Sequence, residues 1–428
     1  MHINSVSIKN FRKLTDVSLK LEQDLTVIVG PNAMGKTSVL EAIRLCKSLL
    51  MPRTHDEAQQ VLIALGASTP HIMFGPFQFD FASFAGSNEK PVEIKLTLAI
   101  SKEEIGMLRV QTAQIAQNIV SAELGQQNTQ SHLGLIQYFS SKEGQHHHAQ
   151  VIEKVTNRLN EIDKLGVIEL SLKITIDQIH GENQIDQALG ATLEGLVEPS
   201  KAIFTYFPAD RSMPVGEVNV SLHSGDMKAH VDSHFASAAN KYPRLKQVIV
   251  NQLITAGQDH LESEFNLIFT HLLPGKRFKG LMQKPTGTIS VRIEDIESGH
   301  IFDIDSMSSG EKGLVLTYLL LRTSLTQNGI ILIDEPELHL NPAVCRKLLD
   351  FLNDHVCKPF GAQVLLCTHS PEILSQAFDR DDFGLYELLK PDSMNPLFRE
   401  DKEEMYSALN RLGVSSSDSL VARGFVFV

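Results

Sequence analysis

Leu25-Thr-Val-Ile-Val-Gly30-Pro-Asn-Ala-Met-Gly-Lys36-Thr-Ser38 is the most informative stretch of the chain. Leu25–Val29 is a continuous apolar run, which is typical of a strand buried on both faces of a parallel sheet. Gly30–Thr37 matches the pattern GxxxxGK[ST], and an amphipathic helix is expected from Lys36 to about Leu50. Strand, glycine loop and helix in this order predict a phosphate-binding loop in an α/β fold.

The chemistry of such a loop explains its residues. Backbone N–H groups curl around the β-phosphate of a nucleotide, and the N-terminus of the following helix adds its dipole. Lys36 would reach the β- and γ-phosphate oxygens, and the hydroxyl of Thr37 would ligate Mg²⁺. The predicted nucleotide contacts in this segment are Gly30, Pro31, Asn32, Ala33, Met34, Gly35, Lys36, Thr37 and Ser38.

Composition limits the class of protein. The chain has 428 residues, of which 42% are hydrophobic and 21% charged, so two or three globular domains are expected. A net charge of −12 supplies no overall field that attracts nucleic acid, although it allows a local basic groove. No signal peptide or membrane-length apolar run is visible, and the four cysteines show no CxxC spacing. We therefore expect a cytoplasmic protein with reduced, buried thiols and no membrane partner.

A second apolar strand ends in two carboxylates. Ile330–Ile333 is followed by Asp334 and Glu335, at the strand end where α/β sheets bind ligands. Asp334 would hold Mg²⁺ through water, and Glu335 would accept a proton from the attacking water as general base. The alternative is that the acidic pair merely ends a strand before a turn at Pro336. The phosphate loop in the same chain favours the catalytic interpretation.

Ser308-Ser309-Gly310-Glu311 has two interpretations. Ser308 and Glu311 form the pattern of a capping box, so the segment can simply start a helix over Lys312–Thr323. A capped helix start is also an anion site, because its first N–H groups lack partners within the helix. The structural and the phosphate-binding interpretations are therefore physically compatible.

Val364–Cys367 reads as another buried strand, and it leads into Thr368-His369-Ser370-Pro371. Ser370 is expected to cap the next helix, with Pro371 as its first residue. A single histidine at a strand end is usually structural. After the preceding motifs, however, His369 is the expected sensor of the γ-phosphate.

Together these segments resemble a known family. The NFR of Asn10–Arg12, with GPNAMGKTS, SSGEK, LIDEPELHLNP and THSPEIL, resembles the RecF/SMC/OLD branch of ABC ATPases. The fit is best with the OLD-like group, which includes ATPase subunits of anti-phage defence systems of the PARIS, Gabija and Septu types. The resemblance covers residues 1–50 and 300–390. Gly310 lies about 24 residues before Asp334, which is the spacing of the ABC signature motif.

The resemblance implies further roles. Arg12 would approach the nucleotide phosphates, and Asn341 would lie in a loop that faces the partner protomer. ATP and Mg²⁺ are the implied cofactors. Two residues depart from the family pattern, because Ser309 replaces the first glycine of the commoner signature and Asn341 stands where OLD-like proteins usually have histidine. The signature residues expected to contact ATP on the opposite protomer are Ser308, Ser309, Gly310 and Glu311.

Three weaker candidates stay open. Gln78 lies 42 residues after Lys36, roughly where transporters place the glutamine that senses Mg²⁺. Arg211, in the segment Phe207–Arg211, would touch nucleotide or a neighbouring subunit, or equally form a surface ion pair. His146–His148 could bind a metal, but a solvated loop tip is favoured because no matching carboxylate or cysteine cluster accompanies them.

We expect the fold to be a P-loop ABC ATPase head of the α/β class, with a mixed sheet and an inserted helical subdomain. Residues 1–100 would form the N-terminal part of the head. Residues 101–165 would form an inserted helical lobe, broken around Ser140–His148. Residues 166–287 would supply linking strands and helices, and 288–428 would complete the head.

The expected function is an ATP-driven switch. Two copies would close around two ATP molecules as a homodimer or a higher homo-oligomer, and closure would control a separate effector such as a Toprim or other nuclease. Slow hydrolysis is enough for such a device, because its output is a population shift. A phage protein as trigger and DNA are further candidate partners.

The C-terminal residues suggest where the effector lies. Glu403–Leu412 and Gly413–Asp418 resemble the stretch that precedes the Toprim domain of OLD-like nucleases. The sequence stops at Val428, where the first Toprim glutamate would come. We therefore expect the nuclease in a separate chain, or a sequence that was cut at this point.

The alternative function is that of a RecF-like ATPase, which binds DNA across the closed dimer in DNA repair or chromosome maintenance. Salt-sensitive DNA binding that ATP enhances would favour it. A transporter subunit is disfavoured by the NFR start, by DEPELHL and by the separation of about 300 residues between Lys36 and Asp334.

Overall fold

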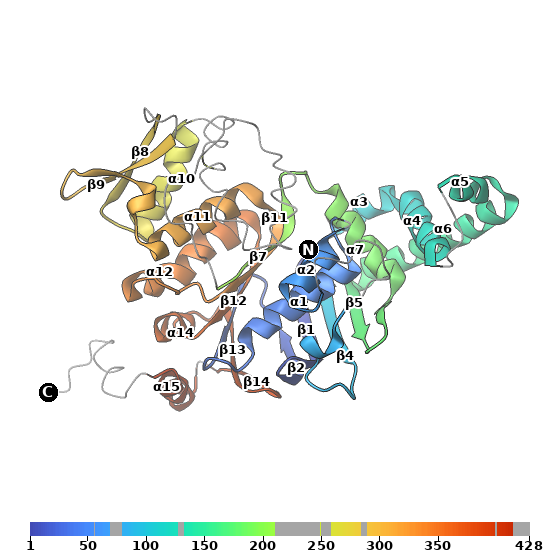
Figure 1. Ribbon diagram of the computed structural model, residues 1–428, viewed down its shortest axis with the longest axis horizontal. Helices are drawn as coiled ribbons and strands as arrows, with labels where there is room; N and C mark the ends of the chain where they lie inside the picture. The colour runs from blue at the N-terminus through green and yellow to red at the C-terminus, as the bar shows by residue number, and fades with distance from the viewer. Residues whose placement is uncertain are drawn as a thin grey trace. The chain divides into compact units, whose positions relative to one another are not determined.

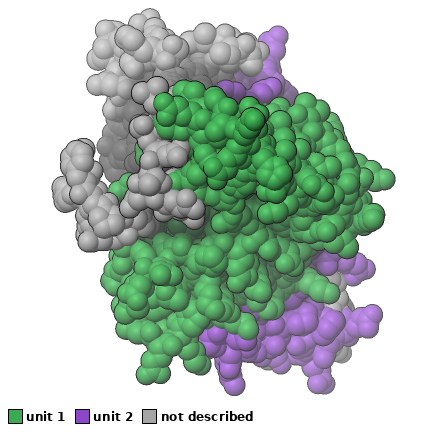
Figure 2. Space-filling view, turned by 90° about the vertical axis from the view of Figure 1, so that its right-hand side faces the viewer, with its two compact units in different colours: residues 1–12, 18–20, 42–197 green, residues 13–17, 21–41, 198–428 purple. Residues whose placement is uncertain are grey.

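A computed structural model describes residues 1–54, 56–68, 79–126, 132–209, 249, 258–283, 289–398 and 400–413. The chain divides into two units, coloured separately in Figure 2. The first comprises Met1–Arg12, Ser18–Lys20 and Ala42–Val197, and the second comprises Lys13–Val17, Leu21–Glu41 and Glu198–Val428.

The first unit is built on a five-stranded sheet with the order β2-β1-β4-β5-β6. Neighbouring strands from β1 to β6 run antiparallel. Side chains in β4 alternate between buried and more exposed positions, as expected when one sheet face covers the core. The strands are β1 (His2–Phe11), β2 (Leu14–Lys20), β4 (Val92–Ala99), β5 (Val167–Ile174) and β6 (Ile179–Glu182).

Most helices of the first unit follow β4 and precede β5 in the order of the chain (Figure 1). Ser141 caps the start of α6 by accepting a hydrogen bond from Gly144 N, and Gly166 ends that helix with φ +72°. The helices are α2 (Glu57–Ala64), the 3₁₀ turn η1 (Phe81–Ser83), α3 (Lys102–Val110), α4 (Thr112–Gln126), α5 (His132–Ser140), α6 (Lys142–Leu165) and α7 (Gln184–Leu196).

The expectation of a loop tip at His146–His148 is wrong, because all three residues lie within α6. The cap at Ser141 starts the helix before the histidines are reached. His147 Nδ1 lies 3.0 Å from Tyr138 Oη of α5. Its Nε2 lies 3.3 Å from Glu123 Oε2 of α4. The side chain of His147 thus links α6 to both α5 and α4. Within the described ranges no group of three or more His, Cys, Asp or Glu residues could hold a metal.

The first unit also buries a charged cluster that joins three helices. Lys47 Nζ, on the later part of α1 (Lys36–Leu50), lies 2.9 Å from Glu57 Oε1 and 3.3 Å from Glu194 Oε1. Ser48 Oγ and Arg53 N also donate to Glu57. Burial would raise the pKa of Glu57, but Lys47, Arg53 and Ser48 together lower it. Burial and the neighbouring Glu57 raise the pKa of Glu194, although Lys47 opposes them.

The second unit contains a six-stranded sheet with the order β14-β13-β3-β12-β11-β7 and a three-stranded sheet with the order β10-β9-β8. In the larger sheet β13, β3, β12, β11 and β7 are parallel, and β14 is antiparallel to β13. The predicted mixed α/β fold is thus confirmed. The strands are β3 (Leu25–Val29), β7 (Ala202–Phe207), β8 (Lys276–Gln283), β9 (Ile289–Asp295), β10 (Ile301–Asp303), β11 (Leu325–Asp334), β12 (Gln363–Thr368), β13 (Phe383–Lys390) and β14 (Ser393–Pro396).

The core of the second unit forms where helices cover the parallel strands. Every residue of β3 and β12 is buried, as their apolar sequences predict. Val27, Ile331 and Leu348 belong to one buried apolar cluster that spans strands and helices. The helical segments are α10 (Gln258–His271), η3 (Ile304–Ser306), α11 (Ser309–Ser324), α12 (Pro342–Leu352), the π-turn η4 (Asn353–Cys357), α13 (Lys358–Phe360), α14 (Pro371–Phe378) and α15 (Lys402–Arg411).

Two further sequence expectations can be compared with the structure. The cysteines are free, buried thiols, as their apolar contexts indicate. Of the helices in the described part of the chain, none has both the length and the apolar character needed to cross a bilayer.

The buried cluster of the first unit yields a matched pair of variants. Glu57→Gln should lower stability by about 1–3 kcal/mol, because it removes a buried charge that accepts bonds from Lys47, Ser48 and Arg53. Glu194→Gln should cost less than Glu57→Gln, because burial and the neighbouring Glu57 raise the pKa of Glu194 and so already disfavour its charged form. Urea unfolding of both variants beside the wild type measures the difference.

The pH dependence of the stability gives a second test of the Glu194 assignment. The unfolded chain releases the Glu194 proton at the ordinary glutamate pKa, about 4.3, while the folded chain retains it to higher pH. The contribution of Glu194 to stability is therefore lost as pH rises above the unfolded pKa, so the stability of the wild type relative to Glu194→Gln should fall over that range. An equal loss in Glu57→Gln and Glu194→Gln at every pH would contradict this assignment.

Candidate nucleotide-binding site

The phosphate loop lies between β3 and α1 and depends on two glycines. Gly30 has φ +157°, and a Cβ there would lie 2.5 Å from Leu388 O, so no side chain fits. Gly35 has φ +109°, a conformation that L-residues rarely adopt. Ala33, between them, also has a positive φ of 65°. The glycines at the two ends of GxxxxG are therefore required by backbone geometry.

Lys36 is held against this loop. Its side chain is buried, with 4% exposure, and its Nζ donates to Gly30 O at 2.8 Å and Pro31 O at 3.1 Å. The ammonium group thus lies along the loop backbone, where it could bind the β- and γ-phosphate oxygens of a nucleotide.

Thr37 connects the loop to the carboxylate end of β11. Its Oγ1 donates to Asp334 Oδ2 at 2.8 Å. Burial raises the pKa of Asp334 to about 6; Thr37 opposes this shift, and the nearby carboxylates Glu335 and Glu41 add to it. A hydroxyl and a carboxylate oxygen are ligands that Mg²⁺ prefers, and a cation would offset this excess of negative charge. The residues present therefore fit a magnesium ion.

Glu335 and His369 meet because β11 and β12 are parallel neighbours, with Asp334 paired to Cys367. Glu335 Oε1 lies 3.1 Å from His369 Nδ1. Glu335 adopts a left-handed φ of +43°, and its N–H donates to Cys367 O at 2.8 Å. The strand register thus brings together two predicted site residues that are 34 positions apart in sequence.

Glu337 is a member of this site that the sequence did not reveal. Its Oε1 accepts hydrogen bonds from Thr368 Oγ1 at 2.6 Å and His369 N at 2.8 Å, and lies 3.2 Å from His369 Nδ1. Burial would raise the pKa of Glu337, but the bonds from His369 and Thr368 lower it. The hydrogen bond with Glu337 in turn raises the pKa of His369. The only sequence signal was a second acidic residue close after Glu335.

The start of α11 confirms the predicted capping box. Glu311 N donates to Ser308 Oγ, and Ser308 N donates to Glu311 Oε2, both at 3.3 Å. Lys276 Nζ donates to Glu311 Oε1 at 2.8 Å. A Cβ on Gly310 would lie 2.0 Å from His339 O, so the helix start packs tightly on the turn that follows Glu335. Contact of this segment with ATP stays a prediction.

For the remaining predicted residues the structure gives other contacts or no placement. Asn341 caps α12 by accepting a hydrogen bond from Ala343 N at 2.9 Å, which gives it a structural role within its own chain. Arg12 belongs to the first unit, where its Nη2 donates to Leu65 O at 3.4 Å. Gln78, Arg211 and residues 414–428 lie outside the described residues.

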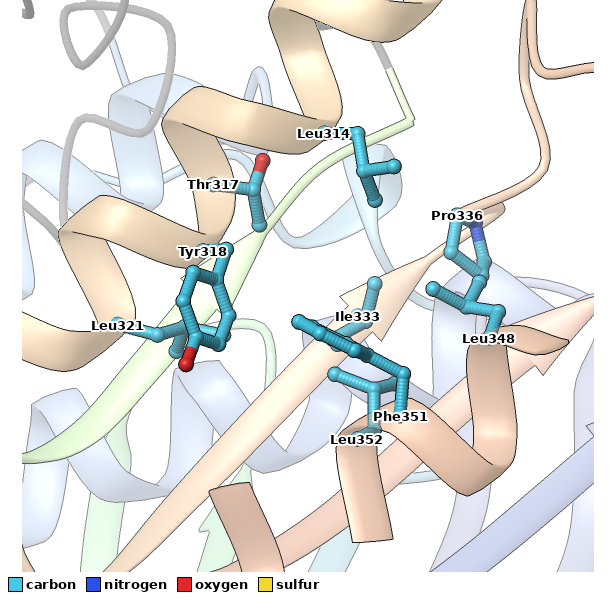
Figure 3. Close-up of a pocket in the computed structure, with 9 residues that line it drawn as sticks. All are labelled: Leu314, Thr317, Tyr318, Leu321, Ile333, Pro336, Leu348, Phe351 and Leu352. Atoms are coloured by element: carbon cyan, nitrogen blue, oxygen red, sulfur yellow. The ribbon is translucent and has the colours of Figure 1, made fainter. Parts of the chain in front are cut away.

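A small cavity of about 30 Å³ lies between the middle of α11, the end of β11 and α12 (Figure 3). Its lining is mainly apolar, and its volume is far below that of a nucleotide. Pro336, next to Glu335, lies at one side, so the cavity is a packing feature where α11, β11 and α12 meet. It is lined by Leu314, Thr317, Tyr318, Leu321, Ile333, Pro336, Leu348, Phe351 and Leu352.

Comparison with known proteins gives the family. A family model described as AAA ATPase domain matches residues 1–374. The chain belongs to this family. AAA ATPase domain proteins take ATP as their ligand, which agrees with the loop at Gly30–Thr37.

Curated relatives include DNA replication and repair protein RecF from two organisms. The Acetivibrio thermocellus protein is 40% identical over 63 residues, which is 15% of this chain and 17% of that protein. The Staphylococcus carnosus protein is 23% identical over 207 residues, which is 44% of this chain and 55% of that protein. The chain therefore spans about half or less of these relatives. The similarity to RecF is therefore limited to part of each protein.

Solved structures of SMC heads are also similar. One, the SmcHead bound to the C-winged helix domain of ScpA, has a TM-score of 0.47 and 12% identity over 93% of this chain and 98% of that chain. The SMC head domain from Thermotoga maritima has a TM-score of 0.41 and 11% identity, covering 93% of this chain and 100% of that chain.

The geometry of the phosphate loop predicts the effect of Lys36→Ala. Removing the ammonium group should weaken ATP binding by about 10–100-fold or more, because charge-assisted bonds to phosphate contribute about 1.5–3 kcal/mol. Titration calorimetry with ATP measures this change. Lys358→Ala, which removes an exposed lysine paired with Asp354, is the control and should bind normally. Near-normal affinity in Lys36→Ala would refute the assignment of this loop.

Proposed function

We propose that this ATPase is an ABC-type head that closes with a second copy around ATP and thereby controls a separate effector. The observation that carries the proposal is the Thr37–Asp334 hydrogen bond of 2.8 Å. It joins the phosphate loop to the strand end that bears Glu335 and lies beside His369. Binding, metal and proton-transfer groups would then act on one γ-phosphate.

In the proposed reaction, Lys36 binds the β- and γ-phosphate oxygens and His369 hydrogen-bonds the γ-phosphate. Thr37 and Asp334 would hold Mg²⁺, which would supply positive charge to neutralise these oxygens. Glu335 accepts a proton from water as the water oxygen bonds to the γ-phosphorus. The bond from that phosphorus to the bridging oxygen breaks, and ADP leaves with inorganic phosphate.

The proposal of a shared site rests on the start of α11. Ser308 and Ser309 are exposed there, and the helix N-terminus favours anions. Gly310 fixes this helix start on the turn after Glu335. A second copy that presents the same face would complete each site by two-fold symmetry, as an isologous dimer does. A higher homo-oligomer could repeat this unit.

For the effector we favour a nuclease in another chain, of the Toprim or a similar class, in an anti-phage defence complex with a phage protein as trigger. The combination of SSGEK, DEPELHLNP and THSPEIL supports this OLD-like assignment. Slow hydrolysis would be sufficient, because ATP acts by shifting the population of closed heads.

The second candidate is a RecF-like ATPase that binds DNA directly, and sequence similarity to RecF favours it. Purification together with the products of neighbouring genes separates the two functions. A co-purifying nuclease favours the switch, whereas ATP-enhanced DNA binding by this chain alone, weakening steeply with salt, favours the RecF-like function.

The proposed base gives a direct test. Glu335→Gln should bind ATP but hydrolyse it about 10²–10⁴-fold more slowly, because the amide cannot accept the proton. Closed dimers should therefore accumulate with ATP. Phosphate release measures turnover, and light scattering after gel filtration measures the dimer.

Glu403→Gln, an exposed carboxylate of α15, is the control and should behave as the wild type. Wild-type turnover in Glu335→Gln would remove Glu335 as the base. If turnover is lost but no ATP-dependent dimer forms, the assignment of Glu335 as the base is supported and the proposed ATP-driven switch is contradicted.

A further inference from the structure

Glu337 makes three contacts around His369, which follows the end of β12. Its Oε1 accepts from the side-chain hydroxyl of Thr368 and from the backbone N–H of His369. The same oxygen lies 3.2 Å from His369 Nδ1. One carboxylate oxygen therefore binds both the backbone and the ring of the residue expected to sense the γ-phosphate.

The position is costly for a carboxylate. The Glu337 side chain is only 8% exposed, and among the described residues no donor reaches its Oε2. Burying an ionised group is unfavourable unless its partners compensate. The negative charge of Glu337 is thus compensated by hydrogen bonds from Thr368 and His369, and from its own backbone N–H, which together lower its pKa.

Glu335 contacts the same ring nitrogen at 3.1 Å but is less suited to holding it. Its side chain is 21% exposed, compared with 8% for Glu337. In the proposed reaction Glu335 must also accept a proton from water, after which its charge no longer attracts the imidazole. Glu337 takes no part in proton transfer, so its charge persists through the cycle.

We propose that Glu337 is a positioning residue, which directs His369 Nδ1 toward the two carboxylates and favours the protonated form of the imidazole ring. The opposite ring nitrogen, Nε2, then remains a donor and points away from the carboxylates. This inference rests on the proposed function in one respect, namely that His369 acts on the γ-phosphate as a cation.

The charges around His369 determine the direction in which its pKa shifts. Glu337 and Glu335, from the turn after β11, favour the protonated ring, whereas burial and Lys36, from the start of α1, oppose it. The net pKa of His369 is raised, with the Glu337 hydrogen bond as the largest cause. Removing only the charge of Glu337 should therefore return the His369 pKa toward its ordinary value, about 6.5.

The experiment compares the full chain with Glu337→Gln, in which the amide oxygen can still accept from Thr368 and His369 N. Histidine ring signals are followed by NMR over pH, and the His369 signal is identified by its loss in His369→Asn. The titration midpoint should shift to lower pH in Glu337→Gln. In Glu337→Asp, which restores the charge, the midpoint should move back toward that of the wild type. This variant also shows whether a folded protein can be obtained with a change at residue 337.

Glu372→Gln is the matched control, because Glu372 hydrogen-bonds Ser370 Oγ and is not among the groups that shift His369. Its His369 midpoint should equal that of the wild type. A shift of the same size in Glu372→Gln, or no shift in Glu337→Gln, would overturn the proposal.

ATP turnover over pH supplies the functional readout. If the imidazolium is required, kcat falls as pH rises through the His369 pKa, and in Glu337→Gln this fall should begin at lower pH. A uniform loss at all pH values would mean a merely structural role and would overturn the proposal. If Glu337→Gln shows the expected shift in the His369 midpoint but the wild type does not hydrolyse ATP, the proposed function is refuted while the link between Glu337 and His369 is supported.

Discussion

The hydrogen bond from Thr37 Oγ1 to Asp334 Oδ2 is the contact on which the arrangement of the site depends. It links residues 297 positions apart in sequence. It is possible only because β12 pairs in parallel with both β3 and β11, which brings the carboxyl ends of these strands to one edge. The phosphate loop leaves β3 at this edge, the carboxylates leave β11, and His369 follows β12. Parallel pairing thus turns three distant sequence motifs into one site.

The turn after β11 connects this site to the start of α11. Glu335 and His339 both have positive φ, a conformation that is uncommon at residues other than glycine. His339 O lies so close to Gly310 that residue 310 has no room for a side chain. A displacement of this turn would therefore move the first turn of α11, and the reverse also holds. In the proposed dimer this coupling would relay the state of one nucleotide to the surface that contacts the other.

Much of the site was predictable because its signals are local. β3 and α1 have the bounds that the sequence indicated, and Ser308 and Ser370 cap their helices as predicted. The role of Glu337 was not predictable, because its partners lie more than 30 residues away and meet it only through strand pairing. The prediction of a loop at His146–His148 was wrong for another reason. Three consecutive polar histidines indicated a solvated loop, but Ser141 caps a helix that begins before them.

The claim that each ATP is shared between two copies is tested most directly by mixing two inactive variants. Lys36→Ala damages the phosphate loop, and Ser309→Arg blocks an exposed position at the start of α11 without burying new atoms. In a mixed dimer one site combines both defects and the other combines two intact halves. We predict that mixing equal amounts restores about a quarter of the wild-type ATP turnover, because half of the dimers then hold one intact site. Turnover that stays as low in the mixture as in either variant alone would contradict a shared site.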